Sequence, residues 1–274
     1  MADSLIRNPV VSGQFYSNSA QRLNQEIKGL LSGTKTHPEE AIGCVLPHAG
    51  YAYSGKVAAK TVACLQLKDN AVILGPNHTG SGAPFSIMTE GCWLTPIGKT
   101  KINSRLAKAI LNKCEFLSDD TIAHLHEHSL EVELPLLQYF KSDIKIVPIV
   151  VSEGQISTYK DIGRSIAQAL KEANLDKSTL IIASSDMTHY EPADYAQKQD
   201  NEAIAAILEL DEDELVDKVK RLNISMCGYI PTAIMLTAAK ILGAKSARLI
   251  SYQTSGEVTG DYSAVVGYAG IVVE

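Results

Sequence analysis

Short apolar runs that end in polar, histidine-containing turns constrain the fold of this chain more than any other feature. Three runs of strand length occur at residues 42–46, 71–74 and 180–183. The turns that follow them read Pro47-His48-Ala49-Gly50-Tyr51, Gly75-Pro76-Asn77-His78 and Ser184-Ser185-Asp186-Met187-Thr188-His189. In an open α/β sheet the carboxyl ends of parallel strands border one crevice, where ligands bind. The pattern therefore predicts that residues distant in the sequence share one site.

Segments with helical periodicity separate these strands. Residues 54–66 link the first two runs, so we expect those strands to be parallel neighbours. Other strands are expected at 144–151, 248–252 and 265–273, and helices at 20–31, 103–114, from about 129, 159–173, 195–208, 213–222 and 230–242. We predict an α/β fold with one domain over residues 1–274 and a central, mostly parallel sheet flanked by helices.

The overall composition excludes several classes of protein. The chain has 274 residues, a formal net charge of −6 and no basic stripe, so we expect no nucleic-acid partner. No apolar run approaches the ~18 residues of a membrane span, and the N-terminus lacks the features of a signal peptide. The five cysteines are widely spaced and form no CxxC pair, as is typical of a reducing compartment. We therefore expect a cytoplasmic protein that does not associate with a membrane.

Two histidines and one cysteine form the strongest candidate metal site. His48 and His78 each follow a strand and lie within two residues of a glycine, and Cys227 directly precedes Gly228 and a helix. Imidazole and thiolate together bind transition metals, and a helix N-terminus stabilises a thiolate. The alternatives are two histidines that cap loops and one cysteine that is a small buried apolar side chain.

Asp186 and His189 are candidates for proton transfer. They share one strand-end turn, where the carboxylate of Asp186 can orient the imidazole of His189. In the alternative interpretation, Asp186 caps a helix and His189 is incidental.

Tyr51, Asn77 and His128 are candidates for lining a pocket. Tyr51 and Asn77 lie in the two histidine turns, and His128 precedes a helix start. For Tyr51, packing in the core is an equal alternative. We expect His124 and His126 to be structural, because alternating histidines in a loop need not converge on one point.

The chain resembles the Memo family, whose prokaryotic branch is called AmmeMemoRadiSam system protein B. The resemblance extends nearly end to end. It depends on Arg7-Asn8-Pro9, Gly13-Gln14-Phe15-Tyr16, Pro47-His48-Ala49-Gly50-Tyr51, Gly75-Pro76-Asn77-His78, Glu127-His128-Ser129-Leu130-Glu131, Ser184-Ser185-Asp186 with His189, Cys227-Gly228 and the segment from Ser255 to Ser263.

That family is similar in fold to the class III extradiol ring-cleavage dioxygenases, which hold a non-haem iron at strand ends. The resemblance implies that His48 and His78 are metal ligands, that Cys227 is the third ligand, and that His189 is a catalytic base with Asp186 beside it. The dioxygenases have a carboxylate where this chain has Cys227. Because a thiolate is softer, zinc or copper fits as well as iron, and the substitution argues against ring cleavage.

The resemblance therefore implies a non-haem iron or copper redox protein with an unknown small-molecule or peptide ligand. A functional link to a radical-SAM protein is implied as well. Two alternatives stay open: a non-enzymatic metal- or peptide-binding scaffold, and a hydrolase of the zinc type.

Overall fold

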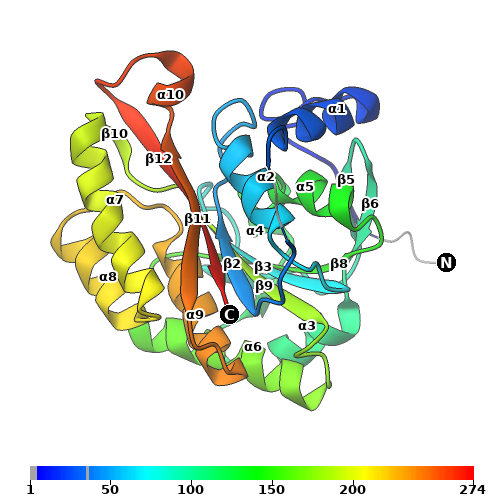
Figure 1. Cartoon of the computed structure of the whole chain (residues 1–274). Helices are drawn as coiled ribbons and strands as arrows, with labels where there is room; N and C mark the ends of the chain where they lie inside the picture. Colours follow the sequence, from blue (N-terminus) through cyan, green and yellow to red (C-terminus); the bar gives the residue numbers. More distant parts are fainter. Residues whose placement is uncertain (1–4, 35–36) are drawn as a thin grey trace.

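A computed structural model describes residues 5–34 and 37–274 and shows a large β-sheet between helices (Figure 1). Its strands are β1 (Ile6–Arg7), β2 (Gly43–Leu46), β3 (Asn70–Pro76), β4 (Phe85–Ile87), β5 (Cys92–Thr95), β6 (Gly98–Lys101), β7 (Ser118–Asp119), β8 (Lys145–Val151), β9 (Thr179–Ser184), β10 (His189–Glu191), β11 (Ala247–Thr254) and β12 (Val265–Val273). The large sheet has the order β10-β12-β2-β9-β3-β8-β4-β7, with β11 paired to β12, and β1-β5-β6 form a second sheet.

The predicted α/β fold is confirmed, and the large sheet is mixed. Strands β2, β9, β3 and β8 form a parallel core. Antiparallel pairs lie on both sides of this core, at β12 next to β2 and at β4 next to β8. Apart from the first residue of β8, the four core strands are buried throughout, because helices cover both faces of a parallel sheet.

Strands β2 and β3 are not neighbours, contrary to expectation, because β9 lies between them. The local sequence predicts the parallel direction of two strands but not which later strand is inserted between them. The insertion keeps the strand ends level, since Ala183 pairs with both Val45 and Leu74. The turns that follow the three strands therefore leave the sheet at the same edge.

The helices are α1 (Ala20–Leu30), α2 (Gly55–Ala63), α3 (Ser104–Leu111), α4 (Ile122–Leu125), α5 (Glu133–Phe140), α6 (Ile156–Glu172), α7 (Ala193–Leu208), α8 (Glu212–Arg221), α9 (Tyr229–Leu242) and α10 (Gly256–Thr259). Helices α6 and α9 pack together on one face of the sheet, and α1, α2 and α5 pack together on the other (Figure 1). Across the part of the chain that the structure describes, no helix has both the length and the apolar character needed to cross a membrane.

Helix α5 begins later than the sequence pattern suggests. The expected start was near Ser129, but the α-helix extends from Glu133 to Phe140. Pro135 consequently lies in the first turn, where the missing N–H of a proline leaves no intrahelical bond unmade. Residues 127–132 are therefore free to form an irregular segment at the strand ends.

A buried ion pair joins the N-terminal segment to this irregular segment. Arg7 is 2% exposed and donates to the Glu131 carboxylate and to the carbonyl oxygen of Glu127. Its guanidinium also lies 4.3 Å from the centre of the Trp93 ring. Glu131 accepts further hydrogen bonds from the backbone N–H of Val10 at 2.9 Å and from the Tyr16 hydroxyl at 2.7 Å. The pair thus fixes the position of residues 127–131.

We predict that Arg7→Ala lowers the free energy of unfolding by about 3–5 kcal/mol, because it leaves the Glu131 carboxylate buried without its cation. Urea denaturation of the purified protein measures the change. The matched control is Arg221→Ala, which removes an exposed pair with Asp217 and should cost less than about 1 kcal/mol. Equal losses in the two variants would contradict the role given to Arg7.

His124 lies in the core and is 0% exposed. Its Nε2 is 3.0 Å from the Ser86 hydroxyl, and its Nδ1 has no hydrogen-bond partner among the described residues. Burial lowers the pKa of His124 to about 4 from an ordinary value of 6.5. The folded protein therefore resists protonation of His124, whereas the unfolded chain accepts a proton below about pH 6.5.

The sign of this pKa shift predicts acid destabilisation. Between pH 7 and pH 4 the unfolded chain takes up a proton at His124 that the folded chain refuses, which costs about 3 kcal/mol of stability. We expect His124→Gln to lose this part of the pH dependence, as measured by urea denaturation at several pH values. His126→Gln, at an exposed position, is the control and should follow the wild-type curve.

Candidate functional site

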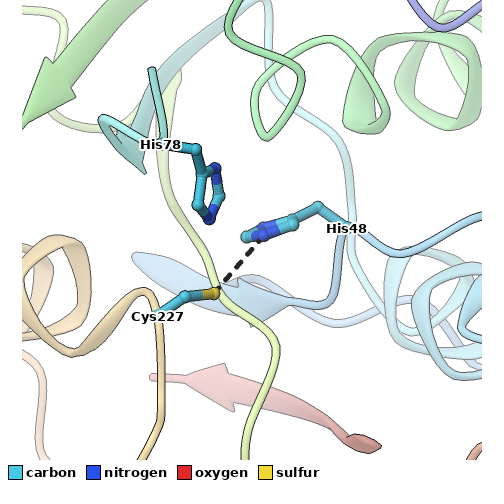
Figure 2. A group of neighbouring side chains, drawn as sticks. All are labelled: His48, His78 and Cys227. Carbon is cyan, nitrogen blue, oxygen red and sulfur yellow. Dashed lines mark hydrogen bonds between the residues drawn. The ribbon is translucent and has the colours of Figure 1, made fainter. Parts of the chain in front are cut away.

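His48, His78 and Cys227 converge at the edge where β2 and β3 end. His48 follows β2, His78 follows β3, and Cys227 lies in the turn before α9. One nitrogen from each ring and the cysteine sulfur all lie within 4.8 Å of one another. Figure 2 shows the three side chains pointing toward a common point. Three segments that are far apart in the sequence thus supply the donor atoms of one group.

His48 is the buried member of this group, at 2% exposed. Its Nε2 lies 3.4 Å from the Cys227 sulfur, and its Nδ1 lies 2.9 Å from the Ser184 hydroxyl at the end of β9. Burial lowers the pKa of His48 well below its ordinary value, and the neighbouring histidines lower it further. The ring is therefore neutral, as a metal-binding imidazole must be.

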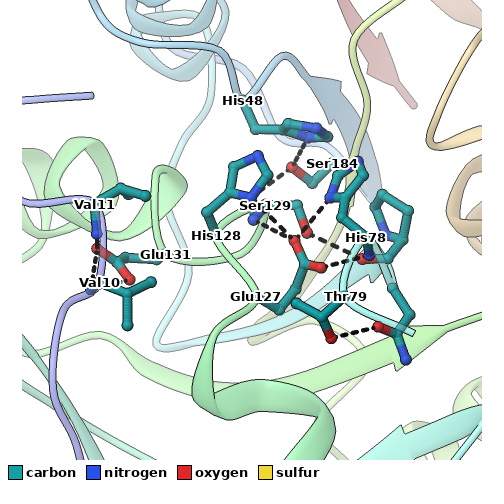
Figure 3. Close-up of polar contacts among 12 residues, drawn as sticks. Val10, Val11, His48, His78, Thr79, Glu127, His128, Ser129, Glu131 and Ser184 are labelled. Atoms are coloured by element: carbon teal, nitrogen blue, oxygen red, sulfur yellow. Dashed lines mark hydrogen bonds and ion pairs between the residues drawn. The ribbon is translucent and has the colours of Figure 1, made fainter. Parts of the chain in front are cut away.

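Glu127 orients His78 through two hydrogen bonds. The carboxylate accepts from the backbone N–H of His78 at 2.6 Å and from the ring Nδ1 at 2.9 Å (Figure 3). Burial raises the pKa of Glu127, but these bonds and the backbone N–H of Ser129 outweigh burial and bring the pKa to about 2. Because an ionised carboxylate only accepts, Nδ1 of His78 carries a hydrogen, and in the neutral ring Nε2 has the lone pair.

Cys227 is half-buried and lies beside the backbone of Asp186. The Asp186 N–H donates to the sulfur at 3.3 Å. Burial raises the pKa of the Cys227 thiol well above its ordinary value, and the Asp186 carboxyl raises it further. In the protein without a bound cation, desolvation therefore outweighs the effect of the helix N-terminus on the thiol.

Asp186 does not hold the ring of His189. Its carboxylate accepts from the backbone N–H of His48 at 2.8 Å, and burial raises its pKa to about 6. The His189 ring is held instead by Ser225, whose carbonyl oxygen lies 2.9 Å from Nδ1. A carbonyl oxygen can only accept, so Nδ1 carries a hydrogen, and in the neutral ring Nε2 of His189 bears the lone pair. Asp186 therefore fixes the turn that carries His48.

His128 lies with the two strand-end histidines. Its ring stacks on His78, with 4.8 Å between the ring centres, and lies 5.5 Å from the ring of His48. The ring of Phe15 packs edge-on against His128, at 5.1 Å between ring centres. Together with His78 and Glu127, His128 forms a second group of side chains close enough to hold one cation.

Asn77 and Tyr51 have structural contacts. The Asn77 side chain bonds the backbone of Ser81 and Gly80, so it stabilises the turn after His78. Tyr51 is 1% exposed, packs in the smaller hydrophobic cluster, and donates to the carbonyl oxygen of Val132. Tyr51 therefore packs in the core, as the alternative interpretation expected.

The sequence reasoning missed the residues that orient the candidate ligands. Ser184 contacts His48, Glu127 contacts His78, and Ser225 contacts His189. The motif that contains Glu127 and His128 drew attention to Glu127. Nothing in the sequence indicated that its carboxylate contacts His78.

Comparisons with known proteins cover nearly the whole chain. Residues 7–272 match the sequence pattern of the family described as Memo-like protein. A MEMO1 family protein of Methanopyrus kandleri is 44% identical, over 97% of this chain and 98% of that protein. Similar proteins of Methanosarcina mazei and Aquifex aeolicus are 45% and 42% identical, each over at least 97% of this chain and at least 98% of the relative.

Proposed function

The chain belongs to the Memo family, and we propose that it is a metal-dependent redox protein in which His48, His78 and Cys227 bind an iron or copper ion. The observation that carries this proposal is the convergence of the three donor atoms within 4.8 Å. A metal-binding imidazole is neutral and has a free lone pair. The lowered pKa of His48 favours its neutral form, and Glu127 holds Nδ1 of His78 so that Nε2 faces away from the carboxylate.

The spacing of the donor atoms supports the fit. Two atoms bound to one tetrahedral ion, with a metal–nitrogen bond of ~2.0–2.1 Å and a metal–sulfur bond of ~2.3 Å, lie about 3.5 Å apart. Nε2 of His48 lies 3.4 Å from the Cys227 sulfur. Little movement of these two side chains is therefore needed for both to reach one ion.

The donor set favours a soft or borderline metal. Two imidazoles with one thiolate suit copper, zinc and iron, whereas magnesium and calcium prefer oxygen ligands. A bound iron or copper ion would supply one-electron chemistry. We do not propose ring cleavage, because Cys227 replaces the carboxylate of the dioxygenases and changes both the charge and the softness of the ligand set.

Two histidines outside the ligand set can accept or donate protons. His189 offers a lone pair at Nε2, since Ser225 holds the hydrogen-bearing Nδ1. His128 stacks on His78 and can orient a ligand or exchange a proton with it. A well-placed imidazole typically accelerates a proton transfer by ~10²–10⁴-fold. We propose His189 as the base and His128 as a pocket residue, with Asp186 holding the His48 turn.

The test is the metal content of protein purified without oxygen or added metal. We expect the wild type to carry iron or copper, and His48→Ala and Cys227→Ser to reduce bound metal by about tenfold or more, because each removes one of three ligands. The controls are Cys64→Ser, at another half-buried free cysteine, and His126→Ala, at an exposed histidine. Equal metal content in all five proteins would refute the site.

Anomalous scattering from crystals separates this function from its alternatives. A peak at the iron or copper edge between His48, His78 and Cys227 supports the redox proposal. A zinc peak there would replace it with the zinc-type hydrolase, in which a metal-activated water is the nucleophile. Protein that stays free of metal but binds a peptide would support the scaffold alternative.

A further inference from the structure

We propose that Ser184 is a positioning residue that fixes His48 as the Nδ1–H tautomer, and that Glu133 holds Ser184 in place for this task. The hydroxyl of Ser184 lies at the end of β9, next to the ring of His48 (Figure 3). On its other side it contacts Glu133 in the first turn of α5. The proposal rests on the proposed function only for its consequence for metal binding; the tautomer itself is a property of the chain alone.

Three groups surround the Ser184 hydroxyl oxygen. The carbonyl oxygen of Ser129 lies at 2.8 Å, Oε1 of Glu133 at 2.9 Å and Nδ1 of His48 at 2.9 Å. A hydroxyl has one hydrogen to donate and two lone pairs that accept. The Ser129 carbonyl can only accept, so it competes for that one hydrogen.

Counting hydrogens decides the direction of the bond to His48. If the hydrogen of Ser184 went to Nδ1 of His48, the oxygens of Ser184 and Ser129 would face each other at 2.8 Å with no hydrogen between them. If it goes to Glu133, the same two oxygens stay opposed. If it goes to the Ser129 carbonyl, Nδ1 of His48 must donate to the hydroxyl oxygen. Only this last arrangement avoids a buried pair of opposed acceptors, which is costly.

Glu133 completes the arrangement as a neutral acid. It is 0% exposed, and its Oε2 has no hydrogen-bond partner among the described residues. Burial raises the pKa of Glu133 well above its ordinary value. A protonated Glu133 donates to Ser184, so the hydroxyl then accepts two hydrogen bonds and donates one. All three of its hydrogen-bonding positions are used.

The two strand-end histidines thus reach the same tautomer by different means. A carboxylate, Glu127, takes the Nδ1 hydrogen of His78, and a hydroxyl, Ser184, takes that of His48. In both rings Nε2 is left with its lone pair, and in His48 that atom faces the Cys227 sulfur at 3.4 Å. The opposite tautomer would present an N–H group where a metal ligand is needed.

The first experiment measures the tautomer of His48 in protein without bound metal. Long-range ¹H–¹⁵N correlation spectra distinguish the two ring nitrogens, and the His48 signals are assigned by their loss in His48→Gln. We expect the Nδ1–H form in the wild type and a rise of the Nε2–H form in Ser184→Ala. An unchanged His48 spectrum in Ser184→Ala, or the Nε2–H form in the wild type, would overturn the proposal.

Ser86→Ala is the matched control. Ser86 is 0% exposed like Ser184, donates to the Asp120 carbonyl oxygen and contacts the Nε2 of a buried histidine, His124. Its loss should alter the spectrum of His124 and leave that of His48 unchanged. A change at His48 in both variants would mean that any buried serine deletion disturbs the site, which would overturn the specific role of Ser184.

Two substitutions of Glu133 test whether it donates a hydrogen bond to Ser184. Glu133→Gln keeps a neutral donor within reach of Ser184, whereas Glu133→Met keeps the size and removes the donor. We expect Glu133→Gln to retain the Nδ1–H form and Glu133→Met to lose part of it. Equal loss of the Nδ1–H form in both variants, or full retention of it in both, would overturn the assignment of Glu133 as a neutral donor to Ser184.

The second experiment titrates zinc into the metal-stripped proteins. We expect Ser184→Ala to bind about 10–100-fold more weakly than the wild type, as is usual when a residue that orients a ligand is removed. Ser86→Ala should bind as the wild type does. Equal affinity of Ser184→Ala and wild type would overturn the effect of Ser184 on binding. A wild type without affinity would instead reject the proposed function, and the spectra would still decide the tautomer.

Discussion

Backbone pairing inside a sheet that is buried on both faces is the constraint on which the site depends. Strands β2, β9 and β3 are buried along their whole length, and their peptide groups are used in pairing with each other. Such an interior has little room for unpaired polar groups. Polar side chains from these strands can therefore gather only where the strands end, and the ladder of hydrogen bonds keeps those ends level.

Three buried glutamates next to the strand ends show how the protein stabilises polar groups there. Glu127, Glu131 and Glu133 are all 0% exposed, although they lie within seven consecutive residues. Glu131 is paired with the Arg7 guanidinium, and Glu127 is surrounded by N–H donors. Glu133 has neither and stays neutral. One short segment thus provides an anchored carboxylate, a charged orienting group and a neutral acid, each determined by its partners.

The sequence allowed the fold class and the strand-end histidines to be predicted, because apolar runs and the turns after them are local patterns. The place of β9 between β2 and β3 depends on contacts of high sequence separation that periodicity does not contain. The same holds for side-chain pairing. Asp186 stands three residues before His189, yet the ring is held by Ser225, which the chain brings in from the turn before α9. Proximity in the sequence suggested Asp186 as the partner of the His189 ring, but the carbonyl oxygen of Ser225 is the group that contacts it.

The insertion of β9 also sets the order in which the site can form during synthesis. Strands β2 and β3 leave the ribosome early, but neither has its shared partner until residues 179–184 have emerged. Cys227 follows later still, and β12, which borders β2, comes last. A nascent chain therefore carries His48 without its partner Ser184 until β9 has emerged, whereas Glu127, the partner of His78, is synthesised earlier. Because such non-local pairings form slowly, His48, His78 and Cys227 come together only late in folding.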